Sequence, residues 1–157
     1  MDAKSELPLA LRAAYMAMHR RTDAQFASYG ITADQFVLLA TLSRGNALTQ
    51  RELARRMPSD PSTVRAMLVL LEKHGLVKRD VHPSDSRART VTLTATGKRK
   101  FRQLWTAGET IRKKMFEAIQ PDNAVLLIGL LSQLEESLNG ESLSGSSLSP
   151  TNKVQSA

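Results

Sequence analysis

Two hydroxyls and a guanidinium stand close together at the start of a segment with helical periodicity. Ser62, Thr63 and Arg65 follow a proline, and apolar residues recur behind them at helical spacing. In a major groove an arginine can bind guanine through two hydrogen bonds, while serine and threonine can bind phosphates or base edges. The alternative is an ordinary capped amphipathic helix, in which serine and threonine are common in the first turn.

A second segment alternates arginines around a turn-like sequence. Arg87 and Arg89 are two residues apart, so both can point to one face of a strand, and Asp85 can hold one of them in place. An arginine at the end of a two-stranded ribbon can enter a narrow minor groove, where the negative potential is enhanced. The alternative is a solvated polar turn. The occurrence of both segments in immediate succession favours DNA binding.

The positive charge of the chain is concentrated around these two segments. The stretch from Arg44 to Arg102 holds 14 of the 22 lysines and arginines but 5 of the 15 aspartates and glutamates, which gives it a net charge of +9. The rest of the chain sums to −2, and the whole chain carries +7. Charge confined to one stretch predicts a surface for a polyanion.

The elements that must position these side chains have clear start and stop signals. A capping box formed by Thr49 and Glu52 opens a short helix, which ends before a proline. Asp60 as N-cap and Pro61 at the first helical position start a second helix, which ends at Gly75. Because only a few residues join the two helices, they must cross steeply, which predicts a helix-turn-helix.

A two-stranded wing and flanking helices complete the expected fold. The segments 76–81 and 90–93 are β-branched and partly alternating, with a polar turn at 83–89 between them. Helices are expected over about 7–28, from a capping box at Thr32 and Gln35 to Gly45, over about 95–119, and from Pro121 onward. The last helix is too apolar for a solvated terminal helix, so we expect a second subunit to cover it.

The chain from Leu7 to Leu138 resembles the MarR-type winged helix-turn-helix transcription regulators. The most specific match is Asp-x-Arg at 85–87 followed by Leu-Thr-x-x-Gly at 93–97, and the segments 60–64 and 71–77 also match. The resemblance implies a homodimer formed through the terminal helices and a pseudo-palindromic operator in double-stranded DNA. It also implies a small, often aromatic and acidic, effector that binds between two lobes and releases the DNA.

The resemblance assigns roles to individual residues. Arg87 would reach into the minor groove with Asp85 as its ion-pair partner, and Ser62, Thr63 and Arg65 would begin the recognition helix. The preceding helix would lie against the DNA backbone through its first residues, Thr49, Gln50 and Arg51. Relatives usually carry polar or basic side chains where this chain has Ala66, Val69 and Leu70, so direct readout is expected to depend on Arg65 and on methyl contacts.

The effector site is expected near the first helix, where Tyr15, His19 and Arg20 follow one another closely. His19 or Arg20 could meet a carboxylate of an anionic ligand. The alternative, surface charges beside an apolar helix stripe, is favoured by the general behaviour of lone histidines and arginines on helices. The chain has no cysteine, which excludes cysteine-based peroxide sensing and disulfides.

We therefore expect a mainly α fold with a small β-wing, that is, an α+β winged helix-turn-helix domain with a helical dimerisation lobe. The domain would cover 1–139, with the DNA-binding lobe at about 32–96, the dimerisation lobe at about 5–29 and 97–139, and a disordered serine-rich tail at 140–157. The expected function is that of a repressor, and the alternative is a winged-helix adaptor that binds proteins without reading DNA.

Several classes of protein are not expected. The sequence holds no catalytic constellation, no cofactor motif and no histidine spacing typical of a metal site, so neither an enzyme nor a cofactor is expected. It has no run of about 18 apolar residues, and its first residues lack the basic-then-apolar order of a secretion signal. We expect a cytoplasmic, nucleoid-associated protein of a prokaryote.

Overall fold

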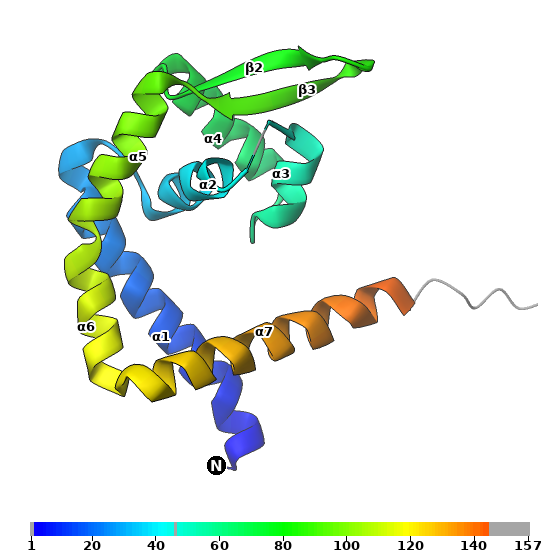
Figure 1. The fold of residues 1–157 in the computed structure, drawn as a ribbon. Helices are drawn as coiled ribbons and strands as arrows, with labels where there is room; N and C mark the ends of the chain where they lie inside the picture. Colours follow the sequence, from blue (N-terminus) through cyan, green and yellow to red (C-terminus); the bar gives the residue numbers. More distant parts are fainter. Residues whose placement is uncertain (1, 46, 145–157) are drawn as a thin grey trace, which may run out of the picture. The chain divides into compact units, whose positions relative to one another are not determined.

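The computed structural model describes residues 2–45 and 47–144, which fall into two compact units. The first unit ends at Arg112 and the second begins at Lys113. Figure 1 shows the elements in chain order. The helices are α1 (Ala3–Phe26), the short 3-10 helix η1 (Ala27–Tyr29), α2 (Ala33–Ser43), α3 (Gln50–Arg56), α4 (Pro61–Lys73), α5 (Ala95–Ala107), α6 (Glu109–Ile119) and α7 (Pro121–Ser144), and the strands are β1 (Leu48–Thr49), β2 (Val77–His82) and β3 (Asp85–Leu93).

The predicted helix starts are confirmed at the level of hydrogen bonds. Both capping boxes are complete: Thr32 is paired with Gln35 at the start of α2, and Thr49 with Glu52 at the start of α3. Each pair satisfies two backbone N–H groups that the first turn of a helix leaves without partners. Gly75 ends the α4 segment with a φ of 71°, a conformation that favours glycine.

The sheet has three strands in the order β1-β3-β2, all antiparallel. The sequence predicted the β2–β3 hairpin but not β1, which pairs Leu48 with Val91. It also placed the turn at 83–89, whereas β3 already begins at Asp85 and the turn is correspondingly tighter. β2 and β3 form the long two-stranded ribbon in Figure 1.

One apolar cluster holds α2, α3, α4 and the sheet together. Leu39, Leu53, Leu68 and Val91 come from these four elements and have no exposed surface. The buried face of α4 consists of Val64, Met67, Leu68 and Leu71, as its periodicity predicts. Burying these side chains fixes which face of α4 remains outside.

The prediction of a single helix over about 95–119 is wrong, because the helix is interrupted at Gly108 and divided into α5 and α6. Glycine is a weak helix former, and a Cβ at this position would lie 3.3 Å from the Leu104 carbonyl oxygen, which is a tight contact. The break leaves carbonyl groups without their helical partners. The Arg112 guanidinium donates to the Trp105 carbonyl at 2.6 Å, and the Gln25 amide donates to the Ala107 carbonyl.

Two helix ends differ from the prediction. α1 begins at Ala3, several residues before the expected start, because the Asp2 carboxylate caps it by accepting from the Ser5 amide at 2.8 Å. α7 continues through Ser144, so the first residues of the segment expected to be a disordered tail are helical. The remainder of that tail, 145–157, lies outside the described residues.

Candidate nucleic-acid interface

The predicted DNA-binding residues gather around one open cleft between α3, α4 and the ribbon. This arginine cleft has a volume of about 700 Å³. Its lining residues are Thr49, Gln50, Arg51, Ala54, Arg55, Pro61, Val64, Arg65, Leu68, Asp85, Arg87, Ala88 and Arg89. The fold thus brings together every predicted contact residue of α3 and the wing with Arg65, while Ser62 and Thr63 lie outside the cleft in the exposed first turn of α4.

Five arginines line the arginine cleft: Arg51, Arg55, Arg65, Arg87 and Arg89. All five are exposed, and among the described residues none of them forms an ion pair. The one carboxylate in the lining belongs to Asp85. A concave surface with this excess of free guanidinium groups attracts phosphates.

Arg55 is a member of the arginine cleft that the sequence reasoning missed. It follows Arg51 by four residues on α3, so the two side chains lie on the same face of the helix. That spacing was the signal that could have identified it. By contrast, Arg79 is unavailable, because its guanidinium donates twice to Glu72, from Nε at 2.6 Å and from Nη2 at 3.1 Å.

The first turn of α4 is organised by Asp60. Its carboxylate accepts from the backbone amides of Ser62 and Thr63, each at 3.0 Å, which makes it the N-cap that the sequence predicts. It also accepts from both hydroxyls, that of Thr63 at 2.6 Å and that of Ser62. The hydrogen bond from the Ser62 hydroxyl, followed by those from Thr63, holds the pKa of Asp60 well below its usual range.

Among the described residues, the Asp85 carboxylate does not form the ion pair with the Arg87 guanidinium that the resemblance implies. The Asp85 carboxylate accepts a hydrogen bond from the Arg87 backbone amide at 3.0 Å instead. An aspartate that binds the amide two residues ahead stabilises a turn, so it supports the wing through the backbone. The other side of the turn has a similar contact, since the Ser84 amide donates to His82 Nδ1 at 3.1 Å.

The middle of the outer face of α4 is apolar, as the sequence indicates. Val69 is 50% exposed and Leu70 is 45% exposed. Neither side chain can donate or accept a hydrogen bond, so at a major groove they can meet only thymine methyls or other apolar groups.

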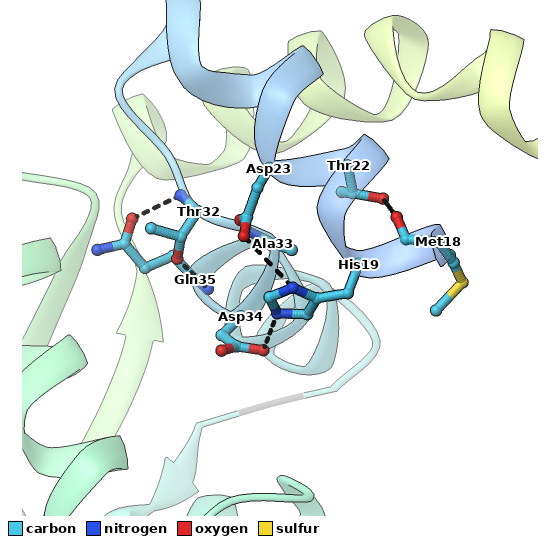
Figure 2. Close-up of polar contacts among 8 residues, drawn as sticks. All are labelled: Met18, His19, Thr22, Asp23, Thr32, Ala33, Asp34 and Gln35. Carbon is cyan, nitrogen blue, oxygen red and sulfur yellow. Dashed lines mark hydrogen bonds and ion pairs between the residues drawn. The ribbon is translucent and has the colours of Figure 1, made fainter. Parts of the chain in front are cut away.

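The structure gives His19 a contact role that the sequence did not predict. Its Nδ1 lies 3.3 Å from the Asp23 carboxylate and its Nε2 lies 3.3 Å from that of Asp34, so the ring links α1 to the start of α2 (Figure 2). Asp23 also accepts from the Ala33 amide at 2.6 Å. Two carboxylates beside the imidazole would repel an anionic ligand, which supports the structural alternative for His19. Tyr15 lies next to it, with ring centroids 5.6 Å apart.

Neither a metal site nor a membrane-spanning helix is found among the described residues. No group of three or more His, Asp or Glu side chains among residues 2–45 and 47–144 could hold a metal ion. In the same part of the chain, no helix is both long enough and apolar enough to cross a membrane.

Comparison with known proteins agrees with this geometry. Residues 31–88 match the model of the MarR family. The HTH-type transcriptional repressor MdtR of Bacillus subtilis (strain 168) is 24% identical over 132 residues, which cover 84% of this chain and 85% of the repressor. The structure of a transcriptional repressor, CouR, bound to a 23-mer DNA duplex is 27% identical, with a TM-score of 0.78, and the match covers 86% of this chain and 96% of that one.

A further structure concerns the regulation of DNA binding of Bordetella bronchiseptica BpsR by 6-hydroxynicotinic acid. It is 24% identical to this chain, with a TM-score of 0.78, and the match covers 87% of this chain and 97% of that one. At this level of identity the likeness shows the fold.

The helix-turn-helix followed by an arginine-bearing ribbon defines a winged-helix DNA-binding protein. The family match over residues 31–88 and the similar repressors support a MarR-type winged-helix transcription regulator. The predicted fold class and DNA-binding function are thereby confirmed. Regulators of this family are not enzymes, in agreement with the prediction.

Proposed function

We propose that this protein is a homodimeric repressor of a pseudo-palindromic operator, from which a small anionic, aromatic ligand releases it. The observation that supports the DNA-binding surface is the arginine cleft, in which α3, α4 and β3 together present five guanidinium groups that form no ion pair within residues 2–45 and 47–144. Such a surface gains affinity by displacing counterions from phosphates. Its place of action would be the nucleoid in the cytoplasm of a prokaryote.

Each element of the arginine cleft has its own role in the proposed complex. α4 enters the major groove and Arg65 binds base edges, while Arg51 and Arg55 on α3 face the phosphate backbone. Arg87 and Arg89 on β3 enter the adjacent minor groove. In a two-fold dimer the half-sites would be centred about one helical turn apart.

The exposed apolar side chains of the terminal helices support the dimer. On α7, Val125, Leu126 and Ile128 are exposed in the single chain, and on α1 the side chains of Leu7 and Tyr15 are exposed as well. Apolar surface of this extent is rare on monomeric proteins. We therefore expect sedimentation equilibrium to give twice the mass of the 17.3 kDa chain.

The effector is proposed to bind in a second cleft, of about 450 Å³, between α2, α3 and α5. Phe36, Val37 and Trp105 supply an apolar lining, and Arg44 and Arg56 supply positive charge. This combination fits an aromatic acid better than the surroundings of His19, which already hold two carboxylates. BpsR, whose DNA binding is regulated by 6-hydroxynicotinic acid, offers a parallel.

The position of the effector can be tested with the intrinsic fluorescence of the protein, because Trp105 is its only tryptophan. Aromatic acids that release DNA should also quench this fluorescence, and Arg44→Ala should abolish both effects while DNA binding persists. Arg20→Ala is the matched variant for the site near α1. Loss of release in Arg20→Ala with a normal response in Arg44→Ala would place the effector at α1 instead.

A winged-helix adaptor that binds proteins remains the alternative, and the exposed Val69 and Leu70 are the observation that favours it. An adaptor would bind its partner through this apolar face. Absence of DNA binding at low salt, together with a protein partner that is lost in Val69→Asp, would support the adaptor.

The DNA-binding proposal is tested by fluorescence anisotropy with operator DNA selected from a random pool. Arg87→Ala should weaken operator binding about 5- to 150-fold, which corresponds to about 1–3 kcal/mol for a specific contact. Arg12→Ala is the matched control, because it removes the same charge from α1, outside the basic stretch. Equal affinities of the Arg87→Ala and Arg12→Ala proteins would contradict the role of the wing.

A further inference from the structure

The hydroxyl protons at the start of α4 are already committed within the protein. The Thr63 hydroxyl donates to Asp60 Oδ2 at 2.6 Å, and the Ser62 hydroxyl donates to Asp60 Oδ1. A hydroxyl has one proton and two lone pairs. When its proton points at Asp60, the side of the oxygen that faces solvent can only accept.

The arrangement is stable because Asp60 has no proton to give back. An ionised carboxylate is an acceptor only, and the hydrogen bonds from Ser62 and Thr63 keep the pKa of Asp60 below its usual range. Four donors converge on this one carboxylate, two backbone amides and two hydroxyls. Rotating a hydroxyl away would leave a lone pair of the carboxylate unpaired beside DNA phosphates.

We propose that Asp60 is a positioning residue that makes Ser62 and Thr63 acceptor-only readers of the major groove. Acceptors pair with the amino groups of adenine (N6) and cytosine (N4), and not with guanine O6 and N7 or thymine O4. They also cannot donate to phosphates, so their role is base readout. The inference rests on the proposed function, in which α4 enters the major groove.

The size of the effect follows from the cost of a mismatched contact. Placing guanine or thymine opposite Ser62 or Thr63 sets two acceptors against each other. A mismatched base pair typically costs about 1–3 kcal/mol, so binding should weaken about 5- to 150-fold at that position.

Asp60→Asn should remove the discrimination against guanine and thymine at the base that Thr63 contacts. Asparagine is as good an N-cap as aspartate, so the helix start is preserved. Its Oδ1 remains where two amides and the Ser62 hydroxyl point, which places Nδ2 opposite Thr63. Nδ2 donates to Thr63 Oγ1, and the hydroxyl proton turns outward. Thr63 can then donate outward and still accept through its second lone pair, so guanine or thymine should bind as well as adenine or cytosine at that position.

The readout is the ratio of affinities for duplexes that differ at one base pair, after selection of preferred sequences with each protein. The ratio matters because Asp60→Asn also removes a negative charge near DNA, which should raise affinity for all sequences equally. Thr63→Val keeps the shape of the side chain without the hydroxyl, and should flatten the preference at that position. In a Thr63→Val background, Asp60→Asn should leave the base preference unchanged.

The outcomes separate this inference from the proposed function. Suppose that the wild type binds its operator specifically and that Arg87→Ala weakens this binding. If Thr63→Val then retains the base preference and Asp60→Asn still discriminates against guanine and thymine, the acceptor-only inference is wrong while the proposed function stands. If the wild type shows no sequence preference and Arg87→Ala binds as tightly as the wild type, the proposed function is overturned with it. Thr63→Val, at an exposed helix position, keeps the test decisive even where Asp60→Asn does not fold.

Discussion

Gly97 is the glycine at which an added methyl group should lower the stability of the fold most. It is buried in the first turn of α5, against the loop that leaves α4. A Cβ added there would lie 1.9 Å from the Leu76 carbonyl oxygen. Ordinary C···O contacts start at about 3.3 Å, so Gly97→Ala would force the two backbones apart by more than 1 Å.

The cost can be worked out from the hydrogen bonds that this movement breaks. The start of α5 is held by Thr94, whose amide donates to the Leu76 carbonyl at 3.1 Å and whose hydroxyl donates to the Gly75 carbonyl at 2.6 Å. Losing both costs about 1 kcal/mol each, and overpacking adds about 1–3 kcal/mol. The better helix propensity of alanine offsets about 1 kcal/mol of this, so the expected net loss is about 2–4 kcal/mol.

Thermal unfolding followed by circular dichroism at fixed protein concentration measures this loss. For a chain of this size, about 2–4 kcal/mol corresponds to a fall in Tm of about 5–15 °C. Gly45→Ala is the matched control, because a methyl there would meet nothing within 4 Å, and its Tm should stay close to that of the wild type. A Gly97→Ala protein with a Tm within about 2 °C of the wild type would refute this account of the α5 contact.

Two further predictions concern carboxylates that hold unit 1 together. Asp23→Ala should lower the free energy of unfolding, measured in urea, by about 1–3 kcal/mol, because it leaves the buried Ala33 amide without its acceptor. Asp23→Asn keeps an acceptor and should lose less stability. Equal losses in the two variants would contradict the role of the Ala33 hydrogen bond. Arg79 lowers the pKa of Glu72 below its ordinary 4.5, so the pair stabilises the fold above about pH 4.5 and this contribution disappears as the pH falls through the folded pKa. Since Glu72 is partly exposed, Glu72→Gln should cost at most about 1 kcal/mol at pH 7 and less at pH 2, and an equal cost at both pH values would count against the ion pair.

The sequence predicted the parts of the fold that depend on hydrogen bonds between near neighbours. The capping boxes, the Asp60 cap and the left-handed glycine at Gly75 each involve residues within a few positions of one another. The buried face of α4 follows from the periodicity of one helix. In all these cases the partner is found by counting along the chain.

The features that the sequence did not predict depend on distant partners. β1 exists because Leu48 pairs with Val91, and in the sequence these two residues come before and after the helix-turn-helix. The break at Gly108 is held by Gln25 of α1, and His19 is engaged by Asp34 of α2. Hydrophobic periodicity cannot indicate such pairs, because it reports the environment of a residue and not its partner.

The sequence by itself determined the kind of surface this protein has: a basic stretch with a capped helix and an arginine-bearing hairpin, flanked by apolar helices. Only the tertiary structure decided which arginines remain free. Arg79 looks as suitable as Arg55 in the sequence, but Glu72 binds Arg79 while Arg55 lines the arginine cleft. The structure likewise decided that the Ser62 and Thr63 hydroxyls donate inward to Asp60. Charge is a property of composition, whereas the availability of a charge or a proton depends on which groups the fold places beside it.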